Sequence, residues 1–541
     1  MPRIRTQWEV ILMTIGITMA CAAAGQAQTS GGPAPFQVLE TSVEEIHAAF
    51  KSGRLTARQL VQSYLDRIQA YDQQGPKINS IITINSKALE EADRLDAAFK
   101  RTGLMGPLHG IPVLVKDEID TAGMPTTLGT VVFKDYRPPL DAFVVAKLKD
   151  AGAVILGKTT LSEFAAGDTY GSLFGATRNP YDLERTAGGS SGGSGAALAA
   201  NFSPLALGEE TSASIRRPGG WNAVVSMRPT AGLVSRTGMY DGWPTEHASM
   251  GPMALNVRDL AILLNLMVGY DPEDPLTALG VGHAPEDYTR FLSPSGLQGA
   301  RIGVLRDVIG ADSEPDSEDF KKVDAVFEKN VAELKSAGAT VVDPIVIPNL
   351  KELLAKRMRH PELTDEALRV WLARNPGSPF KTRSDISNSP DVDKIFPPAK
   401  AAQWKAPSEK TDLVAYGEYL SARQQLLIAL LNVMAEHRLD AIVHTTVEHQ
   451  PSLIRNGMNP PYESGKGVPS LNTFLVYVPV ITVPSGFTTD NLPVGITFLG
   501  RPYSEGAMLR LAYGYEQATH HRIPPKTTPA LPPQSSPQSS R

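Results

Sequence analysis

Three short segments of the 541-residue chain carry a lysine or a serine in surroundings where the side chain could do chemistry. Lys116 ends an apolar run, Ser190 lies in a loop with glycines on both sides, and Ser214 follows the apolar Leu205–Leu207. A serine hydroxyl is a weak nucleophile until a base takes its proton. A neutral lysine can accept a proton, and burial favours the neutral form. Taken singly, each segment also fits an ordinary structural role as a solvated lysine, a linker loop or a packed serine.

Taken together, these segments resemble the amidase signature family. Gly110–Asp117 is similar to the strand that carries the catalytic lysine of that family, and Gly188–Gly195 is similar to its Gly/Ser core. Ser190 and Ser214 are 24 positions apart, which is the spacing expected in that family. Further blocks of the chain also resemble the family: Gly251-Pro252-Met253, Leu492–Ile496 and Glu505. The resemblance covers residues 40 to 522, nearly all of the mature chain.

The resemblance implies a role for each of these residues. Ser214 would be the nucleophile, Ser190 would relay the proton on a peptide bond that is cis after Gly189, and Lys116 would be the general base. Backbone N–H groups would form the oxyanion hole, from Thr211, Ser212, Ala213 and Ser214. The implied reaction is hydrolysis of a carboxamide C–N bond through an acyl-enzyme, with ester cleavage as a side activity. No metal and no cofactor is expected.

Two pairs of residues before the implied nucleophile depart from the family pattern. Ser212-Ala213 stand where the family usually has Gly-Gly, and a side chain there costs about 1 kcal/mol or more if the position requires a positive φ. Glu209-Glu210 replace the usual Thr-Asp. Glu210 keeps a carboxylate that could pair with Arg216 or Arg217. The geometry of the oxyanion hole and the substrate preference therefore stay open.

Three other patterns suggest different chemistry, and their surroundings argue against each. Gly152–Thr159 matches the phosphate-loop pattern, but its variable positions are Ala-Val-Ile-Leu and predict a strand. Gly188–Gly193 contains the G-x-S-x-G pattern of a nucleophile elbow, but residues 179–185 before it do not read as a strand. Late histidines lack the spacing of a metal site and are interpreted as packing or surface residues: His444, His449, His520 and His521.

Composition excludes several classes of protein. The 52 Lys+Arg against 57 Asp+Glu give a net charge of −5, so no basic excess points to nucleic acid or to an anionic membrane. The only cysteine, Cys21, lies near the N-terminus. Disulfide scaffolds, zinc knuckles and cysteine nucleophiles are thereby excluded from the body of the protein.

The two ends of the chain differ from the rest. Arg3 and Arg5 precede an apolar run of about 15 residues, and Gly25-Gln26-Ala27 offers a cleavage site, so residues 1–27 are predicted to be a signal peptide. The run is short for a spanning helix, which needs about 20 residues; an uncleaved anchor is the alternative. We therefore expect an exported protein, periplasmic or secreted, without membrane association after cleavage. Residues 523–541 are rich in Pro, Ser and Gln and predict a disordered tail.

Between these ends, helical and extended patterns alternate, which predicts an α/β fold. Helices are expected at 42–51, 56–68, 86–102, 143–150, 195–200, 250–269 and 412–438, and strands at 110–117 and 153–156. Residues 36–522 are expected to form one domain, with 310–410 as a more variable elaboration of helices and loops. The expected architecture is a mixed, mainly parallel central sheet covered by helices on both faces.

Two further classes of function stay open beside an exported serine amidase. A protein like the A-subunit of glutamine amidotransferases shares the signature but works in the cytoplasm with partner proteins, which the signal peptide argues against. The second class is an exported, non-enzymatic protein that binds a solute or a peptide. The presence of Lys116, Ser190 and Ser214 together argues against it. The sequence names neither the substrate, a small-molecule or peptide amide, nor the oligomeric state.

Overall fold

The computed structural model describes residues 36–240, 248–358 and 360–532. The predicted signal peptide, residues 1–27, lies outside the described residues. The described residues from Phe36 onward form one compact unit. Within them, no helix is both long and apolar enough to cross a membrane.

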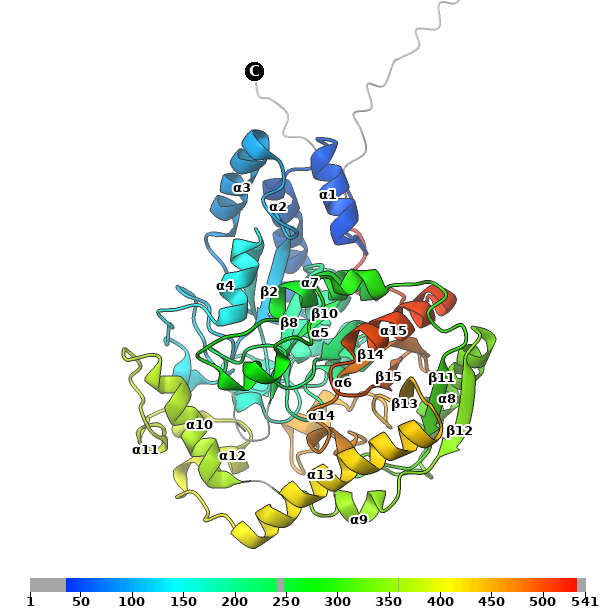
Figure 1. The fold of residues 1–541 in the computed structure, drawn as a ribbon. Helices are drawn as coiled ribbons and strands as arrows, with labels where there is room; N and C mark the ends of the chain where they lie inside the picture. The colour runs from blue at the N-terminus through cyan, green and yellow to red at the C-terminus, as the bar shows by residue number, and fades with distance from the viewer. Residues whose placement is uncertain (1–35, 241–247, 359, 533–541) are drawn as a thin grey trace, which may run out of the picture. The chain divides into compact units, whose positions relative to one another are not determined.

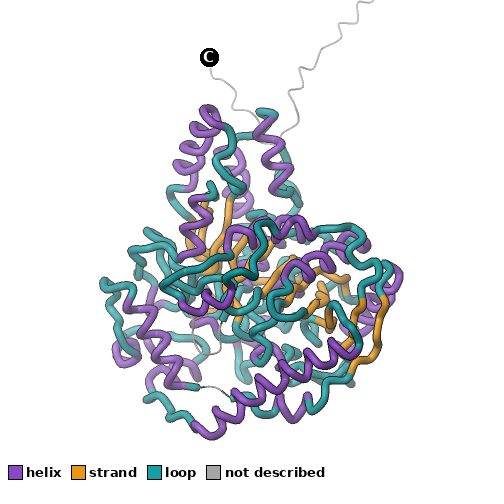
Figure 2. Tube along the Cα trace, in the orientation of Figure 1, coloured by secondary structure: helices purple, strands orange, loops and turns teal. Residues whose placement is uncertain are grey.

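A large sheet runs through this unit, and the described strands in it number eleven, in the order β1-β3-β2-β8-β10-β9-β14-β15-β13-β11-β12. Figure 2 shows these strands among the surrounding helices. The strand bounds are β1 (Ile81–Ile84), β2 (Pro112–Lys116), β3 (Val154–Thr159), β8 (Leu205–Glu210), β9 (Val225–Arg228), β10 (Ser249–Ala254), β11 (Arg301–Leu305), β12 (Thr340–Ile345), β13 (Ala441–Thr445), β14 (Val480–Phe487) and β15 (Pro493–Leu499).

The prediction of a mixed α/β sheet is confirmed, but its mainly parallel character is wrong. Parallel pairing is confined to two groups, β3-β2-β8 and β13-β11-β12. The pairs between and beside these groups are antiparallel. One reason is local: only a short turn joins β14 to β15, and a parallel pair needs a crossover of a dozen residues or more.

Helices surround the sheet, and Figure 1 labels most of them. Their bounds are α1 (Val43–Lys51), α2 (Ala57–Arg67), α3 (Ala88–Thr102), α4 (Phe143–Asp150), α5 (Gly192–Ala199), α6 (Arg216–Trp221), α7 (Val257–Met267), α8 (Glu318–Ser336), α9 (Leu350–Leu354), α10 (Pro361–Ala373), α11 (Arg383–Ser387), α12 (Pro398–Lys405), α13 (Leu413–Glu436), α14 (Ile454–Met458) and α15 (Glu505–Thr519).

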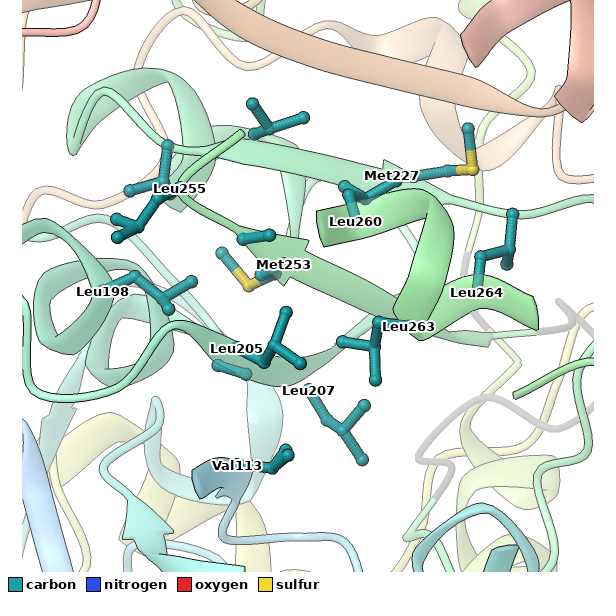
Figure 3. Packing of buried hydrophobic residues seen from close by; sticks show 14 of the residues in the cluster. Val113, Leu198, Leu205, Leu207, Met227, Met253, Leu255, Leu260, Leu263 and Leu264 are labelled. Atoms are coloured by element: carbon teal, nitrogen blue, oxygen red, sulfur yellow. The ribbon is translucent and has the colours of Figure 1, made fainter. Parts of the chain in front are cut away.

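Both faces of the sheet are covered, as the alternation of side chains along β8 illustrates. Leu205 and Leu207 lie beside Leu263 of α7 (Figure 3). Gly208 points to the other face, where a Cβ atom at this position would lie 3.1 Å from Ser191 Oγ at the start of α5. Helices α5 and α6 contact each other, as do α7 and α15.

The segment from 250 to 269 differs from its predicted single helix. Residues 249–254 form β10, a strand between β8 and β9, and α7 begins only at Val257. Every residue of β10 is buried, so the strand lacks the polar alternation of a half-exposed strand. A short, fully buried apolar run cannot be assigned to helix or strand by periodicity alone.

Residues 310–410 divide into two parts. The first supplies α8 and the edge strand β12, which belong to the central layers. The second supplies α10, α11 and α12, which lie together in Figure 1. These helices share an aromatic cluster with the loops after β2 and β3, in which Phe133 packs against Trp371 and Phe164 against Trp404.

The predicted disordered tail differs from the structure over residues 523–532, which are placed against the domain. Arg67 of α2 is buried, and its guanidinium donates to four carbonyl oxygens, those of Ala200, Asn201, Thr528 and Pro529, at 2.8 to 3.0 Å. A buried charged donor needs such acceptors. Arg522 also pairs with Glu40 at 2.6 Å. Residues 533–541 lie outside the described residues.

Candidate active site

Lys116 is the last residue of β2, which lies between β3 and β8 in the sheet. The five residues of this strand are all buried, which fits their apolar sequence Pro-Val-Leu-Val before the lysine. Lys116 is itself fully buried, and its Nζ atom donates to Ser190 Oγ at 2.6 Å. The structure therefore brings together two residues that are 74 positions apart.

Ser190 lies in the loop that enters α5, and the Gly189–Ser190 peptide bond is cis, as the family resemblance implied. Each of three successive carbonyl oxygens in this loop accepts a hydrogen bond: Gly188 O from Thr169 Oγ1 at 2.7 Å, Gly189 O from Arg217 Nη2 at 2.8 Å and Ser190 O from the Ser162 N–H at 3.1 Å. These bonds fix the backbone on both sides of the Ser190 side chain.

Close packing explains the glycines of this loop. A Cβ atom on Gly189 would lie 2.3 Å from Gly167 O, and one on Gly193 would lie 2.3 Å from Thr160 O. Neither neighbour can move aside, because both are backbone atoms. Glycine at these positions therefore lets the loop and the start of α5 sit directly against the segment 160–169.

Ser214 lies on the loop between β8 and α6 and is half-buried. Its carbonyl oxygen accepts a hydrogen bond from the Ser191 N–H at 3.0 Å, which places Ser214 beside the Ser190 loop. Ser191 Oγ also donates to Glu209 O at 3.2 Å, at the end of β8. Within the described part of the chain, the hydroxyls of Ser190 and Ser214 form no hydrogen bond to each other.

Glu210 precedes the loop that carries Ser214, and its side chain forms hydrogen bonds with the residues that follow the loop. Its carboxylate accepts from the N–H groups of Ile215 and Arg216 at 3.0 and 2.9 Å, and from Arg216 Nε at 2.7 Å. Burial alone would raise the pKa of Glu210, but Arg216 and Arg228 outweigh burial and hold it below its ordinary value. Of the two candidate partners, Arg216 pairs with Glu210, and Arg217 instead pairs with Asp168 at 3.1 Å.

The closed loop presents the backbone N–H groups of Thr211, Ser212, Ala213 and Ser214. Among the described residues, none of these four groups has a hydrogen-bond acceptor. Ser212 and Ala213 are not among the described residues with positive φ, so their side chains cause no backbone strain of that kind. The substitution of the usual Gly-Gly by Ser-Ala is therefore compatible with this loop conformation.

The expectation that burial gives Lys116 a lowered pKa is wrong. Burial does act to lower the pKa, but two carboxylates outweigh it and raise the pKa above its ordinary value. Glu118 Oε1 and Glu209 Oε2 each lie 2.7 Å from Lys116 Nζ. At rest the lysine is therefore an ammonium that donates to Ser190.

Sequence reasoning missed three residues that shape this site. Glu118 lies in the turn after β2, which the hydrogen bond from the Ile119 N–H to Lys116 O closes, so no alternation in the sequence indicated that its carboxylate returns to the lysine. Arg217 was considered only as a partner for Glu210. Ser191 has the same neighbours in the sequence as Ser190, so nothing in the pattern indicated that it fastens the loop to Ser214 and Glu209.

The structure also shows what the phosphate-loop match and the elbow-like motif form. The phosphate-loop match contains β3, a fully buried strand, as predicted. The expectation of no strand before the elbow-like motif is wrong, because β7 (Asp182–Thr186) pairs with β6 (Arg178–Asn179) in a small hairpin. That hairpin is separate from the central sheet, whereas an elbow leaves a strand of the main sheet.

The late histidines take part in other contacts. His449 Nδ1 lies 3.0 Å from Asp319 Oδ2. His444 is buried, and burial lowers its pKa to about 4. The described residues contain no group of three or more His, Cys, Asp or Glu side chains that could hold a metal ion.

Comparisons with known proteins agree with this fold. The sequence profile of the family described as Amidase matches residues 59–509. A peptide amidase from Stenotrophomonas maltophilia is 34% identical with a TM-score of 0.80, over 90% of this chain and 98% of that one. An amidase family protein from Bacillus anthracis is 33% identical with a TM-score of 0.75, over 90% and 93% of the two chains.

A relative with a different name shows a comparable degree of sequence identity. The A-subunit of the glutamyl-tRNA(Gln) amidotransferase of Methanosarcina barkeri is 33% identical over 513 residues, which cover 90% of this chain and 98% of that protein. The chain thus belongs to the amidase signature family, whose members are amide-cleaving hydrolases.

Proposed function

We propose that this protein is a serine amidohydrolase with Ser214 as nucleophile, Ser190 as proton relay and Lys116 as general base. The observation that carries the proposal is the buried contact of 2.6 Å between Lys116 Nζ and Ser190 Oγ, in a loop bonded directly to Ser214. A lysine so placed has no evident structural need for a serine partner, since two acidic side chains already contact its Nζ atom.

The proposed reaction begins when Lys116, in its neutral form, takes the proton of Ser190. Ser190 takes the proton of Ser214, and Ser214 Oγ attacks the carbonyl carbon of the amide. Catalytic hydrogen bonds often tighten only when substrate is bound. In the proposed reaction, the hydrogen bond between the hydroxyls of Ser190 and Ser214 forms at that stage. The proton then passes back to the leaving nitrogen, and water releases the acyl group by the same relay.

The negative oxygen that forms in this attack needs donors already in place. The four N–H groups of residues 211–214 lie beside Ser214 without other acceptors in the described structure. Backbone donors aimed at developing charge often supply the largest single contribution to catalysis. Glu210 fixes their loop at both ends, which keeps the donors preorganised.

The substrate is proposed to be a peptide amide or a related carboxamide. One structural relative is named a peptide amidase. The segment that bonds the Ser190 carbonyl also lines a cavity of about 550 Å³, through Phe164 and Ala166. The other wall of this cavity comes from α12 and the residues after it, with Trp404 and Lys400. An aromatic and a cationic side chain would suit an extended substrate with apolar and carbonyl groups.

Hydrolysis of a panel of aliphatic, aryl, anilide and peptide amides by the purified protein tests this proposal. We expect release of ammonia or amine from at least one class without any partner protein, and stoichiometric labelling by a serine-reactive phosphonate. A heat-unfolded sample is the control for nonspecific labelling. A folded protein that binds amides but is never labelled would instead be a binding protein.

The similarity to amidotransferase subunits supports a second candidate, in which the chain works inside a multisubunit complex. We propose export as the feature that separates the two, on the basis of the basic, apolar and small-residue pattern of residues 1–27. N-terminal sequencing of exported protein is expected to begin near Gln28. A protein that retains Met1 in the cytosol and hydrolyses amides only with partner proteins would favour the amidotransferase.

A further inference from the structure

Lys116 is held by two carboxylates that the proposed mechanism does not use. Glu118 Oε1 and Glu209 Oε2 each lie 2.7 Å from Nζ; Glu118 comes from the same chain segment as the lysine, and Glu209 comes from β8. Ser190 Oγ is the third close neighbour, at 2.6 Å. The side chains of Lys116 and Glu118 are fully buried, and that of Glu209 is 5% exposed.

Glu209 is also fixed in place on its other side. Its Oε1 atom accepts a hydrogen bond from Thr211 Oγ1 at 3.1 Å. Thr211 is the first residue of the loop that presents the free N–H groups. Because both carboxylate oxygens are engaged, Glu209 cannot turn away from the lysine without breaking a contact to this loop.

The other charged groups on the neighbouring elements are engaged elsewhere. They form three separate groups: Asp117 with Lys158 of β3, Glu210 with Arg216 and Arg228, and Asp168 with Arg217. The cluster around Lys116 therefore consists of one cation and two acids, with no further cation in contact among the described residues. Burial raises the pKa of Glu118 well above its ordinary value; Lys116 acts to lower it, and the neighbouring Glu209 raises it further.

This inference rests on the proposed function, because it concerns the base of that mechanism. We propose that Glu118 and Glu209 are positioning residues that keep Lys116 protonated at rest and thereby set the pH threshold above which Ser214 can be acylated. In the activating step the ammonium of Lys116 releases one proton to solvent, past the slightly exposed Glu209, and leaves a neutral amine. That amine then accepts the proton of Ser190.

The sign of the effect follows from electrostatics. A carboxylate within 4–6 Å favours the charged lysine and shifts its pKa upward by about 1–3 units. Each Glu→Gln substitution removes one acidic group from the cluster while keeping the size of the side chain. Because the pKa of Glu118 is itself raised, the larger effect is expected at Glu209. The rise of activity with pH, which reports the loss of the Lys116 proton, must then move to lower pH.

The test measures the rate at which a serine-reactive phosphonate labels Ser214 as a function of pH. We expect the midpoint of the rise to move down by about one pH unit or more in Glu209→Gln, by less in Glu118→Gln, and furthest in the double variant. At a pH one unit below the midpoint of the unmodified protein, Glu209→Gln would label at about half of its own plateau rate, whereas the unmodified protein would label at about a tenth of its plateau rate.

Two controls make the test specific. Glu209→Asp keeps the charge, and its midpoint should stay near that of the unmodified protein even if labelling is slower. Glu516→Gln removes a carboxyl from α15 that is also buried and has a pKa raised to about 7 by burial, and it should leave the midpoint unchanged. The soluble, folded fraction of each variant is measured by thermal unfolding, and either single variant suffices if the other does not fold.

A midpoint that stays in place or moves up in the Gln variants would overturn the inference, and the proposed function would stand. Labelling that persists unchanged in Ser214→Ala would overturn the proposed function instead. The two failures are thus distinguishable in the same set of measurements.

Discussion

Ser214→Ala is expected to abolish both amide turnover and covalent labelling by a serine-reactive phosphonate. The substitution removes the atom that forms the acyl-enzyme, and the other hydroxyl of the site cannot replace it. Ser190 Oγ is fully buried and already bonded to Lys116, whereas Ser214 is half-buried. Loss of the nucleophile in a comparable serine hydrolase lowers the rate by a factor on the order of 10⁶.

The measurement is mass spectrometry of the labelled protein together with ammonia release from the best amide of the panel. Ser336→Ala provides the matched control, because this serine is exposed on α8 and bonds only to Ala332 O of its own helix. If Ser214→Ala retained the label and Ser190→Ala lost it, the nucleophile would be Ser190, and the elbow-type interpretation would replace the one proposed.

Removal of either proton-transfer residue is expected to slow acylation severely without preventing it. Ser190→Ala breaks the relay between the base and the nucleophile, and Lys116→Ala removes the base. A positioned proton-transfer group typically contributes about 10²–10⁴-fold to the rate. Slow labelling at Ser214 should therefore survive in both variants, which distinguishes them from Ser214→Ala.

The double variant gives the sharper result, because residues that act as a unit have non-additive effects. Ser190→Ala/Lys116→Ala should be little slower than the slower single variant. Lys158→Met is the control for loss of a buried lysine, since Lys158 lies on the adjacent β3 and contacts Asp117 and Thr126. Multiplicative losses in the double variant would show that Ser190 and Lys116 act independently.

Local signals in the sequence predicted most of the helices. Ser42 and Thr56 each cap a helix and form a capping box with the residue three positions later, so α1 and α2 begin where the pattern indicates. The helix expected at 412–438 is α13, whose N-cap is Asp412. In each case the residues that fix the element are neighbours in the chain.

The central sheet could not be predicted in the same way. Strands β10 and β9 are buried in the middle of the sheet, so exposure does not alternate between the residues along either strand. Their direction depends on which strands they pair with, and Met253 of β10 lies opposite Ser226 of β9 only after the chain has folded. The alternation of helical and extended patterns favoured a mainly parallel sheet. That expectation was wrong because the direction of these strands depends on pairing between distant parts of the chain.

The candidate site shows the same division. Lys116, Ser190 and Ser214 could be singled out because their segments are distinctive. The protonation of Lys116 could not be predicted, since it depends on Glu209, which is 93 positions away and reaches the lysine from the neighbouring strand of the sheet. Burial alone predicted a lowered pKa, and only the folded arrangement shows two carboxylates that raise it.

The guanidinium of Arg67 has a consequence for the order in which the chain can complete its structure. Two of its four acceptors lie at residues 528 and 529, while α2 is among the first helices to be synthesised. Before residues 528 and 529 have been synthesised, the Arg67 guanidinium lacks these two acceptors, and water must take their place. The contact between α2 and residues 528 and 529 can therefore form only after nearly the whole chain has been synthesised.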